Sequence, residues 1–171
     1  MSTVRKINDA VQHQPLRDFL AGAVTLNLAN KNCGSAQNSL INPSMSTAGD
    51  FAIEGKIYTR AASSSVFALE DTTVPIGGGM TFVLCLNSAG SGIGYASDVL
   101  TSEQVSTAGA IASVQASNIL PDIPATMCPV GLYTVVAGSV SHVSGSSSFS
   151  LVDSAGGSHL FTQLMNMNTT S

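Results

Sequence analysis

The sequence predicts a mainly β protein, with an antiparallel β-sandwich or jelly-roll-like body behind a short helical N-terminal segment. Short apolar runs of β-forming residues recur from residue 51 onward, and Gly-, Ser- and Pro-rich turns separate them. The first 22 residues instead have the apolar spacing of a helix. Short strands at near-regular spacing are typical of sandwiches and jelly rolls. We therefore divide the chain into a helical segment at 1–30, an extended loop at 31–50 and a β-sandwich body at 51–171.

The N-terminal segment is predicted to be helical because its apolar residues fall on one side of a helix. Val4, Ile7 and Val11 are spaced i, i+3 and i+7. Pro15 interrupts this pattern and opens a second short helix, which Gly22 ends.

Strand patterns begin directly after this segment. Residues alternate between apolar and polar over Ala23–Ala29, which predicts a strand. Residues 31–50 are rich in Asn, Gly, Ser, Pro and Ala, and a loop of this length is usually functional or held by a partner. Phe51–Arg60 has the clearest alternation and predicts one continuous strand, with Glu54 and Lys56 on a face that is either solvated or at the rim of a contact with a partner.

The later body repeats apolar runs between turns. Met80–Asn87 is predicted to pair with Ile93–Ala96 as a hairpin around a Gly- and Ser-rich turn. Leu100–Asn118 combines helical apolar spacing with frequent Ser, Thr and Gly, which leaves both helix and irregular structure open. Gly131–Ala137 predicts another strand, and alternation continues over residues 139–143.

Charge is sparse and unevenly distributed. Charged residues make up 9% of the chain and hydrophobic residues 44%, and no lysine or arginine follows Arg60. Soluble surfaces normally carry mixed charge at roughly a quarter of residues, so this composition favours packing against copies or other partners. The net charge of −4 and the lack of clustered cations argue against binding to nucleic acid or to a membrane surface. Neither a membrane-spanning run nor a secretory signal is visible, so we expect synthesis in a cytoplasm.

Cysteines, histidines and glycines form no motif for a metal or a cofactor. The three cysteines are far apart and are interpreted as buried thiols, Cys85 most clearly, because it lies in an apolar run. The histidines lack metal-ligand spacing, and His142 is expected on the solvent-exposed face of a strand. Gly90–Gly94 favours a hairpin turn over a dinucleotide-binding loop, because no helix pattern follows it.

Catalysis by paired carboxylates is the remaining enzymatic hypothesis. The candidate pairs are Glu70 with Asp71 and Asp98 with Glu103. Solvated acids beside turns are the simpler interpretation of both pairs. We therefore expect no enzyme and no cofactor.

Seven stretches follow one another in order between residues 50 and 164: Phe51–Ala61, Phe67–Leu69, Val74–Leu86, Asn87–Gly90, Leu120–Pro124, Cys128–Val135 and Phe149–Leu164. Together they resemble small virion structural proteins of tailed bacteriophages. The resemblance implies a capsid decoration (cement) protein on the outer capsid surface. A head-fibre or tail-fibre receptor-binding module is the alternative, with the loops Gly90–Gly94 and Gly145–Ser148 as recognition tips.

The resemblance also implies partners, namely the major capsid protein and further copies of the chain in a homotrimer. A decoration protein bridges capsid subunits at many sites, so each interface need not be strong alone. The basic amphipathic N-terminal segment is then expected to dock on the capsid through Val4, Arg5, Ile7, Val11, Arg17 and Phe19. A helix packed on the chain's own sheet is the alternative for this segment.

Overall fold

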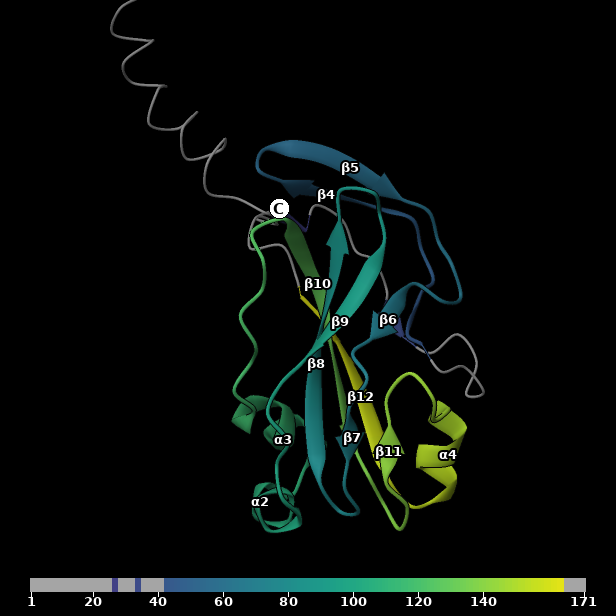
Figure 1. Ribbon diagram of the computed structural model, residues 1–171, viewed down its shortest axis with the longest axis vertical. Coiled ribbons are helices and arrows are strands. Elements are labelled where there is room, and N and C mark those ends of the chain that lie inside the picture. The colour runs from purple at the N-terminus through teal and green to yellow at the C-terminus, as the bar shows by residue number, and fades with distance from the viewer. Residues whose placement is uncertain (1–25, 28–32, 35–41, 165–171) are drawn as a thin grey trace, which may run out of the picture.

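Strands make up most of the regular secondary structure in this computed structural model, which describes residues 26–27, 33–34 and 42–164 (Figure 1). The elements are β1 (Leu26–Asn27), β2 (Cys33–Gly34), β3 (Ser44–Met45), β4 (Gly49–Ile53), β5 (Lys56–Arg60), β6 (Phe67–Leu69), β7 (Thr73–Val74), β8 (Gly79–Asn87), β9 (Gly92–Ala96), α2 (Ser102–Ala108), α3 (Ile111–Ser117), β10 (Met127–Val136), β11 (His142–Val143), α4 (Phe149–Ser154) and β12 (Ser158–Gln163). The prediction of a mainly β protein is confirmed.

The largest sheet within the described residues has five strands in the order β12-β10-β8-β9-β6. Its neighbours pair antiparallel, except β6 and β9, which pair in parallel. β8 lies at the centre because its apolar run is buried on both faces. β6 approaches β9 closely because Gly94 has no side chain, and a Cβ there would lie 2.5 Å from Leu69 Cδ2.

The hairpin predicted between residues 80 and 96 is confirmed as β8 and β9. Asn87 Oδ1 accepts hydrogen bonds from the backbone N–H groups of Ala89 (3.0 Å) and Ser91 (2.9 Å). Gly90 has a φ of 75°, a left-handed backbone that favours glycine. The Gly-rich stretch is therefore a hairpin turn, as the sequence indicated.

The prediction of one continuous strand over Phe51–Arg60 is wrong. The chain reverses at Glu54 and Gly55, whose φ angles of 49° and 74° fit a two-residue type I′ turn. The turn brings Tyr58 opposite Phe51, and their rings stack with centroids 5.7 Å apart. Tyr58 rather than Ile57 therefore faces the core. β1 pairs with the other side of β4, so β5 is an edge strand among the described residues.

The main core lies on one face of the large sheet, where the β4–β5 hairpin, β7 and α4 cover it (Figure 1). The buried members are Met45, Phe51, Ile53, Phe67, Leu69, Val74, Met80, Phe82, Leu84, Leu86, Cys128, Val130, Tyr133, Val135, Ala137, Phe149 and Val152. Tyr133 is central, because its ring stacks on Phe82 and on Phe161 at centroid distances of 5.8 and 4.7 Å.

The opposite face of the sheet carries polar side chains where α3 crosses it. Thr81 of β8 and Thr134 of β10 are opposite one another, and their hydroxyl oxygens are 2.9 Å apart. Asn118 Nδ2 donates to Thr81 Oγ1 at 2.8 Å, and Gln115 Nε2 donates to Thr134 Oγ1 at 2.8 Å. Helix and sheet are thus joined by hydrogen bonds between side chains.

Two further residues extend this arrangement across the sheet. Thr162 of β12 donates to Gln115 Oε1 at 2.9 Å, and Ser97, just after β9, donates to Asn118 Oδ1 at 3.1 Å. We call the set the hydroxyl–amide ladder: Ser97, Asn118, Thr81, Thr134, Gln115 and Thr162. Because most of these groups are buried, each hydrogen bond replaces one to water that folding removes.

Residues 100–118, where the sequence left two interpretations open, form two short helices. Thr101 and Gln104 form a reciprocal capping box at the start of α2. Gly109, with a φ of 75°, separates α2 from α3, and Val114 is the buried residue of α3. In the described part of the chain, no helix is long and apolar enough to cross a membrane.

Several predictions concern the first 50 residues. The predicted N-terminal helix lies outside the described residues. Leu26–Asn27, within the strand predicted at Ala23–Ala29, is β1. Residues 31–50, expected as an extended loop, contain the β2–β3 pair and the start of β4.

We expect Thr81→Val to lower the free energy of unfolding by about 1–3 kcal/mol, because it removes a buried hydroxyl that two ladder residues contact. Chemical denaturation of the full chain measures this change. Thr73→Val, at an exposed strand position, is the matched control and should change stability by less than about 0.5 kcal/mol. Equal effects of the two substitutions would contradict the role given to the ladder.

Candidate functional site

The six residues predicted to dock on a capsid lie outside the described residues: Val4, Arg5, Ile7, Val11, Arg17 and Phe19. The candidate site is therefore built from the described surface. Within it, the second face of the large sheet has several partly exposed apolar side chains around a small buried cluster.

Above the hydroxyl–amide ladder, this face is covered incompletely. A small second core of Val83, Cys85 and Met127 is buried there. Four residues lie over it and remain partly exposed: Ile93, Tyr95, Ile123 and Leu132. The connector after α3 adds two more apolar residues that are largely exposed, with Ile119 at 74% and Leu120 at 46%. We call these six residues the apolar face.

Sequence patterns did not single out the apolar face. Its residues come from β9, β10 and the connector, which are distant in the sequence and meet only in the folded sheet. Ile119 and Leu120 were one available signal, because two adjacent large apolar residues stand directly before the connector's prolines. Exposed apolar groups of this kind are typical of interaction surfaces.

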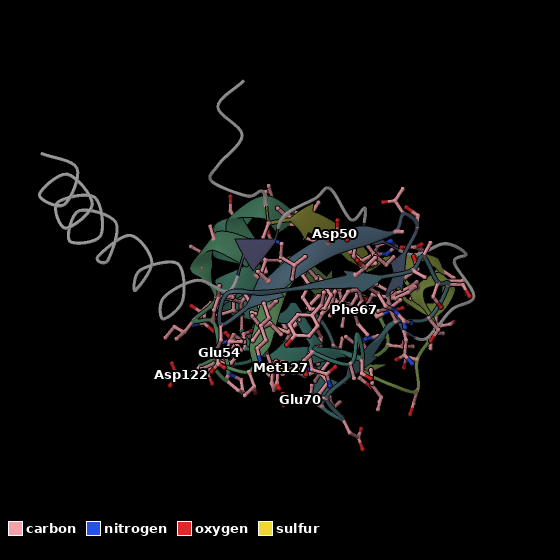
Figure 2. The ribbon with its side chains drawn as sticks, turned by 90° about the horizontal axis from the view of Figure 1, so that it is seen from above. Asp50, Glu54, Phe67, Glu70, Asp122 and Met127 are labelled. Carbon is pink, nitrogen blue, oxygen red and sulfur yellow. The ribbon has the colours of Figure 1, made fainter. Side chains whose placement is uncertain are left out.

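Two exposed carboxylates flank the apolar face. Glu70 Oε2 accepts a hydrogen bond from Ala96 N at 2.8 Å, which places it at the end of β9. Burial, and to a smaller extent the charges of Cys85 and Glu70, raise the pKa of Tyr95. Asp122 lies in the connector beside Ile123, and Figure 2 shows both carboxylates at the rim of the molecule.

The described cations lie on the edge strand instead. Lys56 and Arg60 of β5 are the lysine and arginine residues of the described chain, and no ion pair joins either to a described carboxylate. Ile57, which lies between them in the sequence but on the opposite face of the strand, is 69% exposed. Figure 2 shows Glu54, in the turn of this hairpin, on the same side of the molecule as Asp122.

All four carboxylates considered for catalysis are exposed, and two of them have local structural roles. Glu70 holds the end of β9 through the hydrogen bond to Ala96. Glu103 lies in the first turn of α2, where the helix dipole favours a negative charge. Asp71 and Asp98 are exposed. Among the described residues, no three His, Cys, Asp or Glu side chains are grouped in a way that could hold a metal ion.

The prediction that His142 is exposed to solvent is wrong. His142 is 2% exposed, and neither ring nitrogen has a hydrogen-bond partner. Uncharged residues surround it: Ala137, Val140, Ser141, Ser147, Leu151 and Val152. This burial lowers the pKa of His142 from 6.5 to about 4. Local alternation gave no sign of this, because β11 pairs with β7, which is remote in the sequence.

His159 lies in a different environment, at the edge of the aromatic core. Its Nδ1 is 3.1 Å from Asp153 Oδ1, although the geometry is not that of a hydrogen bond. The nearby Tyr133 hydroxyl is buried without a partner, and burial, with a smaller effect of the Asp153 charge, raises the pKa of Tyr133. These groups meet where α4 packs on β10 and β12.

The interpretation of Cys85 as a small buried hydrophobe is confirmed. Its side chain is fully buried, and burial, aided by the charge of Cys128, raises the pKa of the Cys85 thiol to about 12. A thiol with so high a pKa is a poor nucleophile at neutral pH. Cys128 is also buried, and Cys33 lies in β2.

Comparisons with known proteins identify no relative of this chain. Neither a protein-family model nor a curated protein nor a solved structure matches the chain.

We expect His142→Leu to reduce the loss of stability at acid pH. The unfolded chain binds a proton at His142 below about pH 6.5, whereas the folded chain binds it only near pH 4. Stability that depends on neutral His142 is thus complete above pH 6.5 and falls as the pH decreases toward 4, by up to about 3 kcal/mol.

Chemical denaturation between pH 4 and 8 measures this difference. The variant should lose less stability than the unsubstituted chain over this range. His159→Leu, beside Asp153, is the control and should leave the acid dependence due to His142 in place. Parallel curves for His142→Leu and the unsubstituted chain would contradict the prediction.

Proposed function

We propose that this chain is a virion structural protein of a tailed bacteriophage, namely a capsid decoration protein bound to the outer capsid surface as a homotrimer. The observation that carries the proposal is the apolar face, with Ile119 and Leu120 largely exposed on a body that is poor in charge. A chain with such a surface gains stability when a permanent partner covers it. The ordered resemblance of seven stretches between residues 50 and 164 supports the same function.

The arrangement of the sheets also supports a sandwich or jelly-roll type of body. Phe51 and Ile53 of β4 pack in the same core as Phe82 and Leu84 of β8. The short sheet of β1, β4 and β5 thus lies against one face of the larger sheet. Such a body presents loops and edges outward.

Docking through the N-terminal segment fits the distribution of charge. Arg5 and Arg17 belong to that segment, whereas the body after Arg60 has acidic residues but no lysine or arginine. A basic amphipathic segment is suited to an acidic, partly apolar capsid surface, where rim charges guide association. Repetition over many lattice sites then strengthens the shell.

Co-sedimentation of the full chain with emptied, undecorated heads of its own phage tests this proposal. The unsubstituted chain should bind, and Ile7→Asp with Arg5→Glu should weaken binding at least about tenfold, because apolar and charged contacts are lost together. Ile76→Asp is the matched control, because Ile76 is 62% exposed in the body, outside the docking segment. It should bind like the unsubstituted chain.

Two results would overturn the decoration function. One is a full chain that does not bind heads at any salt concentration. The other is a chain that binds host cells instead, with equal affinity for the unsubstituted chain and the Ile7→Asp, Arg5→Glu variant. The second result would establish the receptor-binding alternative.

A further inference from the structure

Two exposed surfaces of the body have complementary chemistry. The apolar face is flanked by the carboxylates of Glu70 and Asp122, and no basic residue of the described chain lies within it. The β5 edge, which we define as Lys56, Ile57 and Arg60, has an exposed lysine at its start and a half-exposed arginine at its end, and Ile57 is exposed on the opposite face of the strand. The β5 edge therefore has the positive charge that the apolar face lacks, and the apolar face has the flanking carboxylates that the β5 edge lacks.

Within one chain, neither surface covers the other or neutralises its charges. No ion pair joins Lys56 or Arg60 to a described carboxylate. Ile57 remains 69% exposed, and Ile119 remains 74% exposed. β5 also has no strand on its outer side in the described structure, so its edge can accept a neighbour.

We propose that a second copy of this chain covers the apolar face with its β5 edge. Ile57 of that copy packs on Ile119 and Leu120, and its Lys56 lies against Asp122. This inference rests on the self-association within the proposed function, and it assigns that self-association to named residues. A second copy is favoured over an unrelated partner because the chain itself supplies the cations and the exposed isoleucine that this face requires.

Light scattering coupled to size exclusion, over a range of concentrations, tests the apolar part of the contact. Ile57→Ser and Ile119→Ser should each raise the dissociation constant of the assembly at least about tenfold, since each removes one exposed isoleucine from the interface. Ile76→Ser is the matched control, because Ile76 is 62% exposed outside both surfaces, and its assembly should equal that of the unsubstituted chain. All three positions are exposed, so the variants should fold, which circular dichroism checks.

Charge reversal tests the pairing between copies. Lys56→Glu and Asp122→Lys should each weaken assembly of the variant alone, since each opposes two like charges across the contact. Mixing the two variants should restore mixed assemblies in native mass spectrometry, because the reversed charges then face each other. A contact within one chain would give no recovery on mixing. Glu103→Lys, on α2, is the control for reversing an exposed acid elsewhere.

Three results would overturn the inference. The first is a full chain that stays monomeric at every concentration. The second is an assembly that Ile57→Ser and Ile119→Ser leave unchanged. The third is an assembly that Arg5→Glu with Arg17→Glu weakens while Lys56→Glu does not, which would make the N-terminal segment the occupant. Binding to heads is measured separately, so failure of this contact and failure of the decoration function are distinguishable.

Discussion

The hydroxyl–amide ladder is the interaction on which the second face of the protein depends. Thr81 and Thr134 place hydroxyl groups in the middle of the sheet, on the central strands β8 and β10, whose side chains are otherwise mostly apolar. Buried hydroxyls need partners, and besides pairing with each other these two accept hydrogen bonds from Asn118, directly after α3, and from Gln115 of α3. The ladder therefore specifies where the helix lies and in what register, which apolar packing alone specifies less strictly.

This placement has a consequence for the rest of the face. Because α3 is short and is held over the threonines, it does not extend over Val83 and Cys85. The connector from Asn118 to the start of β10 has to cross that region as extended chain, and it covers the region only in part. The exposed isoleucine and leucine of the connector thus follow from the position of the helix that precedes them.

Local patterns predicted the elements whose partners are close in the sequence. The β8–β9 hairpin follows from an apolar run, a turn with Asn87 and Gly90, and a second run. The β4–β5 turn was missed because Glu54 and Gly55 keep the two-residue alternation, so the pattern continues through the reversal. His142 and the apolar face could not be predicted, because their surroundings come from strands far apart in the chain. The predicted docking residues lie outside the described structure.

The position of Lys56 and Arg60 on an exposed edge strand also determines where a trypsin-like protease can cleave the body of this protein. A trypsin-like enzyme cleaves after lysine or arginine, and from residue 61 to Ser171 the chain has neither. Everything from β6 to β12 is thus a single tryptic fragment, whether folded or not. This fragment contains all five strands of the large sheet, whereas the β4–β5 hairpin, which supplies Phe51 and Ile53 to the shared core, lies before the cleavage site.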